Sequence, residues 1–123
     1  MRVHDLDHIV LNVSDVERSL GWYRDLLGLA PDRLDEWRRG DVPFPSVRVN
    51  DKCVIDLFGT ERSGENMNHL CLVVDRGEVD AIATDPRFDV IDGPVQRWGA
   101  RGDGTSVYVR DPDGNVVELR SYD

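Results

Sequence analysis

Residues 7–13 read Asp-His-Ile-Val-Leu-Asn-Val, and residues 68–74 read Asn-His-Leu-Cys-Leu-Val-Val. Both segments begin with a polar residue and a histidine and continue into an apolar run. The two histidines, His8 and His69, lie 61 residues apart. Short apolar runs of this kind are typical of buried or half-buried β-strands. The recurrence of one pattern at two places predicts that the chain contains two copies of one structural unit.

The repeat continues through the later part of each half. Residues 46–49 match residues 106–109 at an offset of 60, and residues 54–57 match residues 116–119 at an offset of 62. The offsets differ only across connecting segments, where insertions are tolerated. We therefore expect one domain over 1–123, built from a module of about 1–62 and a module of about 63–123, with no linker between them.

Each half is predicted to fold as β-α-β-β-β, which makes the chain an α+β protein. The helix expected over 15–27 has apolar residues three or four positions apart, Ser14 or Asp15 as its N-cap, and Gly28 at its end. A shorter helix is expected over 77–84, before Pro86. The expected strands are 7–13, 33–38, 44–50 and 53–58 in the first half, and 68–74, 88–91, 105–109 and 115–120 in the second.

Composition narrows the classes of partner. The chain has 123 residues, with 24 acidic and 15 basic side chains and a formal net charge of -9. This charge argues against nucleic acid and anionic membranes as partners. The sequence has no apolar run long enough to cross a membrane and no signal-peptide core at its start. Cys53 and Cys71 lack metal or redox spacing, so we expect reduced thiols and a cytoplasmic location.

The repeat superposes His8 on His69 and Asp56 on Glu118. Each histidine begins the first strand of its half, and each carboxylate lies within the last strand. Glu118 interrupts the apolar run 116–119, where a buried carboxylate is costly unless it is paired or bound to a metal. Two imidazoles and two carboxylates facing one concavity would suit a borderline divalent cation. The alternative for each residue alone is an ordinary surface histidine or an outward-facing carboxylate.

Three segments carry a resemblance to a known family: DHIVLNVSDVERSLGWYRDLLGL near the start, NHLCLVV in the middle, and GPVQRWGARGDGTSVYVRDPDGNVVELRSY at the end. They resemble the vicinal oxygen chelate superfamily, which includes glyoxalase I, extradiol dioxygenases, fosfomycin-resistance transferases and bleomycin-binding proteins. The final segment is most similar to a small bacterial glyoxalase-like subgroup. The resemblance implies paired βαβββ modules whose mixed sheets curl into a cup around a metal, usually within a homodimer.

The resemblance also implies a ligand set. The first-strand histidines and the last-strand glutamate of the second module correspond to His8, His69 and Glu118. The fourth ligand of glyoxalase I is a glutamate whose position is occupied here by Asp56, which is shorter by one methylene. Asp56 could contact a metal through water, or leave one coordination position open. Histidine ligands favour Zn, Ni, Fe, Co or Mn over Mg or Ca, and the sequence does not choose among them.

Residues 93–104 are rich in glycine and have no helical period, so they are interpreted as a loop that could close over a site. Arg97 and Arg101 in this loop, and Tyr108 after it, are candidate substrate contacts. Cys71 should share a strand face with His69, where a packed thiol is expected. Trp22 and Trp37 are expected to pack in the core or at a dimer surface, and His4 to lie in an exposed tail. The segment 111–115, Asp-Pro-Asp-Gly-Asn, is interpreted as a turn rather than a calcium loop.

These residues predict a metal-dependent, glyoxalase-like lyase or isomerase that acts on a small oxygen-rich molecule. A bound metal would stabilise an oxyanion, and Glu118 or Asp56, if released from the metal, could move a proton. An extradiol-type ring-cleavage dioxygenase is the second hypothesis. The third is a non-catalytic protein that binds a drug or metabolite, as bleomycin-binding relatives do. The substrate, the metal, any thiol cofactor, and the pairing of modules within or between chains stay open.

Overall fold

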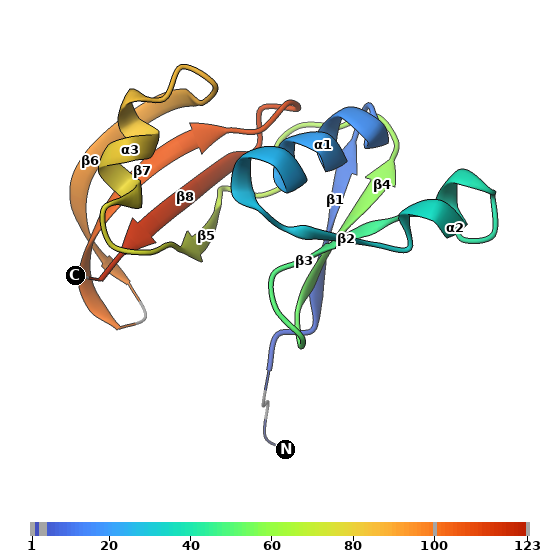
Figure 1. The fold of residues 1–123 in the computed structure, drawn as a ribbon, viewed down its shortest axis with the longest axis horizontal. Helices are drawn as coiled ribbons and strands as arrows, with labels where there is room; N and C mark the ends of the chain where they lie inside the picture. Colours follow the sequence, from blue (N-terminus) through green and yellow to red (C-terminus); the bar gives the residue numbers. More distant parts are fainter. Residues whose placement is uncertain (1, 3–4, 100, 123) are drawn as a thin grey trace. The chain divides into compact units, whose positions relative to one another are not determined.

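The computed structural model describes residues 2, 5–99 and 101–122 (Figure 1). His4 lies outside the described residues. The chain divides into two compact units, Met1–Asn66 and Met67–Asp123. Each unit contains one four-stranded mixed sheet that is open rather than closed into a barrel. None of the helices built from described residues combines the length and apolar character that crossing a membrane requires.

In the first unit the sheet has the order β1-β4-β3-β2. Strand β1 (His8–Val13) runs parallel to β4 (Val54–Gly59), and β3 (Ser46–Arg48) runs antiparallel to both β4 and β2 (Ala30–Asp32). Helix α1 (Val16–Leu27) packs against one face of this sheet (Figure 1). The core beneath it is formed by apolar side chains at alternating strand positions and at one helical stripe: Leu11, Val13, Leu20, Tyr23, Val47, Ile55 and Leu57.

Helix α1 confirms the expected helix over 15–27. Asp15 is the N-cap, and its carboxylate accepts a hydrogen bond from the backbone N–H of Arg18 at 3.0 Å. Gly28 ends the helix in the left-handed region, with φ of 70°. The strand expected over 33–38 is wrong: the strand lies at Ala30–Asp32, and α2 (Leu34–Arg38) follows it. Arg33 has a left-handed φ of 60°, which breaks the extended backbone and starts the helix.

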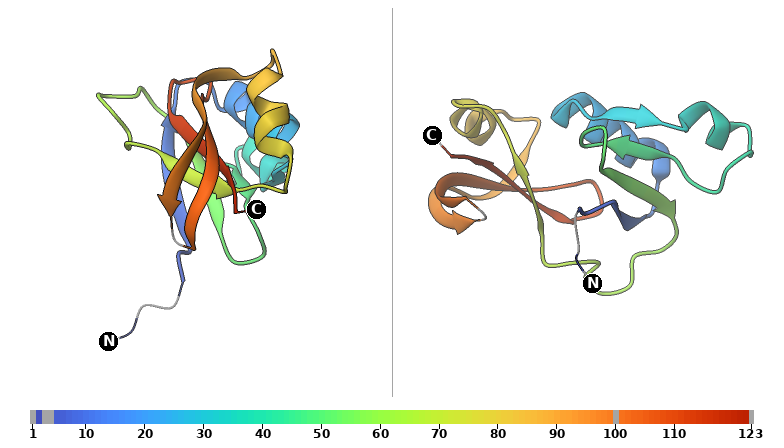
Figure 2. Two further views of the ribbon diagram at one scale, coloured as in Figure 1. Left: turned by 90° about the vertical axis from the view of Figure 1, so that its left-hand side faces the viewer. Right: turned by 90° about the horizontal axis from the view of Figure 1, so that it is seen from below.

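The second unit repeats this arrangement with the sheet order β5-β8-β7-β6. Strand β5 (Leu70–Val73) runs parallel to β8 (Val116–Ser121), and β7 (Gly102–Arg110) is antiparallel to both β8 and β6 (Asp89–Gly99). Helix α3 (Glu78–Thr84) covers one face of the sheet, burying Val79 and Ile82 (Figure 2). The first and last strands of each predicted half are thus paired with each other in both units.

The segment 93–104 is not a loop. It forms most of a long β6–β7 hairpin that pairs continuously from Val95 with Ser106 to Gly99 with Gly102. Two of its glycines, Gly93 and Gly104, reflect tight packing between strands. A Cβ at Gly104 would lie 2.7 Å from the Ser121 carbonyl oxygen, and a Cβ at Gly93 would collide with the Ser106 carbonyl oxygen. The expected strand over 88–91 is therefore too short, because β6 continues through two register shifts to Gly99.

The turn expected at 111–115 is confirmed. The buried Asp111 carboxylate accepts hydrogen bonds from the backbone N–H of Asp113 and of Asn115 at 2.9 and 2.8 Å, and from the Asn115 side-chain amide at 2.9 Å. Gly114 has φ of 80°, and its N–H donates to the Asp111 carbonyl oxygen. This turn joins β7 to β8 and so fixes the register at which Tyr108 lies opposite Glu118.

Gly93 and Gly102 test this account of the hairpin. Both have positive φ, 94° and 98°, but only Gly93 faces a neighbouring backbone. Gly102→Ala should cost about 1 kcal/mol of unfolding free energy, because alanine is strained in this region. Gly93→Ala should cost clearly more, since the strand must also shift. Denaturant unfolding of both variants measures the difference, and equal losses would contradict the packing explanation.

Candidate functional site

The candidate site lies on the face of the second sheet opposite α3. Cross-strand pairing places Cys71, Glu118, Tyr108 and Asp92 in one row across β5, β8, β7 and β6. Arg120 and Ser106 occupy the next row, since they pair with each other. Paired residues share a sheet face, so their side chains project to the same side. His69 precedes β5 by one residue and extends the same face at its edge.

Glu118 is the centre of this face. It is 4% exposed, and its Oε1 accepts a hydrogen bond from Ser106 Oγ at 2.6 Å. Its Oε2 lies 3.2 Å from His69 Nε2. The side chains of Tyr108 and Cys71 also hydrogen-bond to the carboxylate. The costly carboxylate that interrupts the apolar run is thus surrounded by polar partners, as burial of a charge requires.

Burial by itself would raise the pKa of Glu118. Hydrogen bonds from Ser106 and Tyr108, together with the positive charges of Arg120 and His69, outweigh that effect and hold the pKa below its usual range. Glu118 is therefore ionised at neutral pH despite its burial. An ionised carboxylate can accept a proton or bind a cation.

His69 is oriented by the residue before it. Its Nδ1 donates to the Asn68 side-chain oxygen at 2.6 Å, because an amide oxygen can only accept. Nε2 then faces Glu118 Oε2 at 3.2 Å. The Tyr108 ring packs edge-on against the imidazole, with centroids 5.8 Å apart. Two electron-rich atoms at this distance need a cation between them, either a proton on Nε2 or a metal ion, so the donor chemistry of the pair fits a divalent metal.

The first unit carries a related but looser pair. His8 Nδ1 lies 2.7 Å from the carboxylate of the preceding Asp7. This hydrogen bond, with added charge from Asp56 and Asp7, outweighs desolvation and raises the pKa of His8 above its usual value. Asp56 is 6% exposed and accepts a hydrogen bond from Ser46 Oγ at 2.5 Å. Val10 lies opposite Asp56 in register, as Cys71 lies opposite Glu118.

The register corrects one detail of the repeat. Ser46 pairs directly with Asp56, whereas the residue paired with Glu118 is Tyr108. Ser46 is thus the equivalent of Tyr108, and matching Ser46 to Ser106 by sequence was wrong by two residues. Ser106 reaches Glu118 diagonally from the neighbouring row. A diagonal contact suits the longer glutamate side chain, while the shorter aspartate takes its hydrogen bond from directly across the strand.

The four predicted ligands therefore fall into two pairs, with His8 and Asp56 in the first unit and His69 and Glu118 in the second. Across the part of the chain that the structure describes, no three His, Cys, Asp or Glu side chains are grouped closely enough to hold one metal ion. Each pair supplies the nitrogen and oxygen donors that Zn²⁺ and similar ions accept.

Cys71 differs from the expected packed thiol. It is exposed on the site face, because β5 is the edge strand of its sheet. Desolvation by its neighbours, reinforced by the negative charge of Glu118, raises the pKa of its thiol to about 11. The thiol is therefore protonated at neutral pH and acts as a weak donor to Glu118 rather than as a nucleophile. Cys53 is also a free thiol and is half-buried.

The three predicted substrate contacts have different surroundings. Tyr108 is half-buried in the central row, where burial and the charge of Glu118 raise the pKa of its hydroxyl while Arg97 opposes them. Arg97 is exposed on β6, on the same face. Arg101 lies at the tip of the hairpin, with its guanidinium 5.3 Å from the centre of the Tyr122 ring and its backbone N–H bonded to the Tyr122 hydroxyl at 3.2 Å.

Sequence reasoning missed Ser106, Asn68 and Arg120. Arg120 is 4% exposed, its guanidinium stacks on Tyr122 at 4.9 Å, and it donates to the Arg97 carbonyl oxygen. Strand alternation carries the signal for it, since Arg120 follows Glu118 by two residues and must share its face. Ser106 carries the same signal, since it precedes Tyr108 by two residues on β7, whereas Asn68 has none, because an asparagine just before a strand is ordinary.

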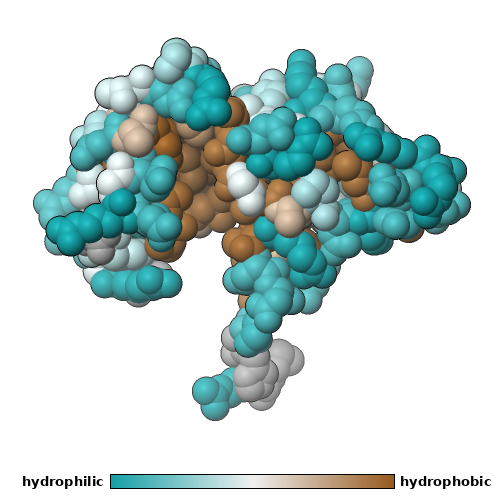
Figure 3. Space-filling model, in the orientation of Figure 1, coloured by the Kyte–Doolittle hydropathy of each residue, from teal (hydrophilic) through white to brown (hydrophobic). Residues whose placement is uncertain are grey.

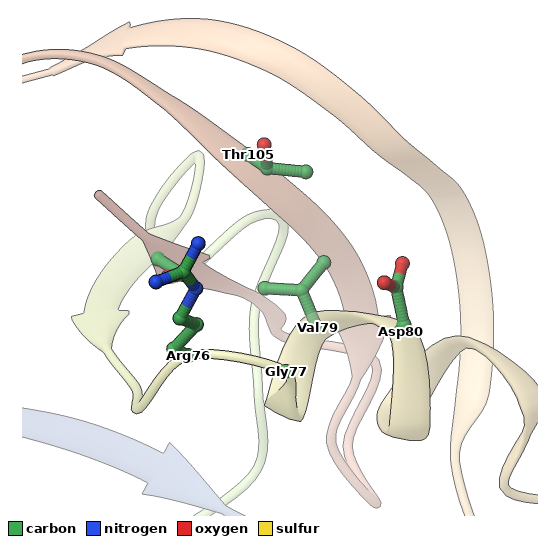
Figure 4. Close-up of a pocket in the computed structure, with 6 residues that line it drawn as sticks. Arg76, Gly77, Val79, Asp80 and Thr105 are labelled. Carbon is green, nitrogen blue, oxygen red and sulfur yellow. The ribbon is translucent and has the colours of Figure 1, made fainter. Parts of the chain in front are cut away.

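A shallow pocket lies on the opposite, helix-covered face of the same sheet (Figure 4). It is lined by Arg76, Gly77, Val79, Asp80, Thr105 and Ser121. Thr105 and Ser121 pair with each other, and each is next in sequence to a residue of the site face, so their side chains project from the opposite face. The pocket thus contains none of the predicted site residues. Apolar surface is exposed elsewhere on the molecule (Figure 3), and Val10, Phe58 and Val73 are at least 40% exposed on the open sheet faces.

The chain belongs to the Glyoxalase/Bleomycin resistance protein/Dioxygenase superfamily, whose family model matches residues 5–119. This confirms the family expected from the sequence. The chain is 29% identical to virulence protein STM3117 of Salmonella typhimurium, over 99% of this chain and 87% of that protein. It is 30% identical to a probable lactoylglutathione lyase of Synechocystis, over 91% of each.

The fold agrees with this assignment. The solved structure of an integron cassette protein from the mobile metagenome of Vibrio cholerae superposes on the chain with a TM-score of 0.79 and 30% sequence identity. The match covers 100% of this chain and 98% of that one. The predicted α+β fold of two repeated modules with mixed sheets is therefore confirmed.

Ser106 should control the ionisation of Glu118. Ser106→Ala removes the hydrogen bond that favours the charged carboxylate, so the pKa of Glu118 should rise in metal-free protein. The lost stabilisation should be largest above the unfolded pKa of glutamate and should vanish as the pH falls through the folded pKa. NMR titration of the side-chain carboxyl measures the change. Ser46→Ala, which affects Asp56 instead, should leave Glu118 unchanged, and a shift in both variants would refute this assignment.

Proposed function

We propose that the protein is a metal-dependent enzyme of the glyoxalase type, a lyase or isomerase that acts on a small oxygen-rich molecule. The observation that carries the proposal is the His69–Glu118 pair, with Nε2 and Oε2 3.2 Å apart on an open sheet face. Asn68 fixes the tautomer in which Nε2 has its lone pair available, an outer contact typical of metal-binding histidines. Similarity to a probable lactoylglutathione lyase supports the same chemistry.

His8, His69 and Glu118 are the residues that would hold the metal, with Asp56 as a weaker fourth. Asp7 orients His8 as Asn68 orients His69, through a hydrogen bond to Nδ1. Asp56 is the weaker ligand because its side chain is one methylene shorter than the glutamate at this position in glyoxalase I. Zn, Ni, Fe, Co or Mn suits this donor set. When bound, a divalent cation would act as a Lewis acid that stabilises negative charge on substrate oxygens.

The protein side chains would then position the substrate and move its proton. Ser106 holds Oε1 of Glu118 and leaves Oε2 toward the open face, where it can accept a proton from the substrate. Tyr108 and Arg97 are the proposed substrate contacts, since both lie on this face. Arg101, which stacks on Tyr122, would hold the tip of the hairpin in place. The same proposal includes a homodimer and a cytoplasmic location with reduced cysteines.

Metal binding is the first test. Protein loaded with Zn²⁺ or Ni²⁺ and freed of excess ion should retain about one ion per chain, as measured by plasma emission spectrometry. His69→Ala and Glu118→Gln should each lower the affinity by roughly 10-fold or more, because each removes or weakens one ligand. Cys71→Ser, on the same face but protonated, is the matched control and should retain the metal. A wild-type protein that takes up no metal would refute the proposal.

Turnover is the second test. Metal-loaded protein should convert the hemithioacetal of methylglyoxal and a thiol into the thioester, followed by its ultraviolet absorbance. Glu118→Gln should reduce kcat by about 100-fold or more, as expected for loss of a positioned base. Tyr122→Phe, outside the proposed chemistry, should retain the activity. A metal-loaded protein that is inactive on several such hemithioacetals would exclude the glyoxalase assignment.

One observation favours a dioxygenase as the second candidate. If the shorter Asp56 leaves its coordination position open, the donors that remain are two histidines and one carboxylate, the set typical of non-haem iron oxygenases. Iron-loaded protein that consumes oxygen with a catechol would support this reading over the first. Tight binding of a drug without turnover or metal would instead indicate a binding protein, as in the bleomycin-resistance members that give the superfamily part of its name.

A further inference from the structure

Arg97 is brought onto the site face by the feature in which the two units differ most. The β6–β7 hairpin has strands of 11 and 9 residues, whereas β2 and β3 have 3 residues each. Arg97 pairs with Gly104, and Gly104 lies on the same strand face as Ser106 and Tyr108. The hairpin therefore places an arginine beyond the row of Glu118, whereas in the first unit Arg33, directly after β2, reaches Ser46 in the row of Asp56.

The guanidinium of Arg97 turns back toward the central row. Its Nη2 lies 3.6 Å from the carboxylate of Asp92, which pairs with Tyr108, while its Nη1 donates to the Gln96 carbonyl oxygen at 2.9 Å. The side chains of Arg97 and Asp92 are 47% and 59% exposed. An exposed ion pair of this length contributes little stability, so the guanidinium can exchange Asp92 for a bound anion at small cost.

A second guanidinium lies beneath the first. Arg120 donates to the Arg97 carbonyl oxygen and is 96% buried, since only 4% of its surface is exposed. Its Nε is buried without a hydrogen-bond partner among the residues that the structure describes. Gly104 provides the room for it, because a Cβ there would lie 3.2 Å from Nε. Among the described side chains, Arg120 thus faces the buried carboxylate of Glu118, while Arg97 has only the exposed carboxylate of Asp92 as its ion-pair partner, and Arg120 Nε is a donor left without an acceptor.

We propose that Arg97 and Tyr108 form an anion-binding subsite beside Glu118, which takes a carboxylate group carried by the substrate. The planar guanidinium of Arg97 suits two coplanar carboxylate oxygens, and the Tyr108 hydroxyl, which hydrogen-bonds to Glu118 in the free protein, would turn to the bound anion. This inference rests on the proposed function, because it names the substrate class of the same site.

Metal-free protein tests the inference separately from metal chemistry. Pyruvate is the probe, and pyruvamide, of the same shape but uncharged, is its comparison. In NMR titrations the wild-type protein should bind pyruvate at least tenfold more tightly than pyruvamide, with shifts centred on Arg97 and Tyr108. Inorganic phosphate should bind more weakly than pyruvate. Equal binding of the two probes, no binding of pyruvate, or tighter binding of phosphate would overturn the proposal.

The variants separate this subsite from general attraction of anions. Arg97→Gln should reduce pyruvate affinity at least tenfold without unfolding, because the side chain is exposed. Arg97→Lys should recover only part of the affinity, since an ammonium lacks the planar pair of donors. Arg101→Gln, of equal charge change at the hairpin tip, should bind like the wild type. Loss of affinity in Arg101→Gln equal to that in Arg97→Gln would refute the subsite.

The two proposals can fail independently. A protein that discriminates pyruvate from pyruvamide but takes up no metal would contradict the proposed function and leave the anion subsite standing. A protein that binds metal and turns over a hemithioacetal, but shows no preference for pyruvate, would do the reverse.

Discussion

In each unit the first strand pairs in parallel with the last, and this pairing determines where the chemistry lies. The pairing sets Val10 opposite Asp56 and Cys71 opposite Glu118. His8 precedes Val10 by two residues, and His69 precedes Cys71 by two residues, so each histidine shares a sheet face with the carboxylate of its unit. A parallel pair requires a long crossover connection, which explains why the residues of each pair are almost 50 positions apart in the sequence. The intervening helix and hairpin complete the sheet and bury its other face.

The carboxylate at this register is stabilised by side chains from the neighbouring strands. Glu118 loses hydration on burial, and that loss is offset by hydroxyl donors on β7 and by positive charge on β8 itself. These hydrogen bonds and charges keep the buried Glu118 ionised, whereas apolar surroundings alone would favour its protonated form. In the first unit a single serine serves Asp56, and His8 takes its close contact from Asp7. The two units thus place a histidine and a carboxylate at equivalent positions, but the contacts around these side chains differ in strength.

Strand periodicity was sufficient to predict much of this arrangement. Leu11 and Val13, like Ile55 and Leu57, alternate along their strands as residues of one buried face do, and the cap residues Asp15 and Gly28 mark the ends of α1. The repeat also indicated which histidines and carboxylates are equivalent. These features are local or periodic, so they are visible in one sequence.

What the sequence did not reveal depends on contacts between distant segments. Glycine at positions 93 and 104 is typical of loops, yet here it permits close packing against the Ser106 and Ser121 carbonyls. Arg33 begins α2 from a backbone conformation that arginine seldom adopts, and nothing in its neighbours signals it. The diagonal contact of Ser106 with Glu118 likewise follows from register rather than from residue type.

The difference between the hairpins explains why one repeat can have a richer site than the other. A short β2–β3 pair ends soon after the row of Asp56, so few side chains can reach beyond it. The longer β6–β7 hairpin continues past the row of Glu118, and its register shifts and Gly93 redirect β6 so that Arg97 lies on the site face. Arg120 fills the space that Gly104 leaves and ties the hairpin to β8. Extension of one hairpin in a duplicated unit is therefore a direct physical route from two equivalent histidine–carboxylate pairs to one pair equipped for a charged ligand.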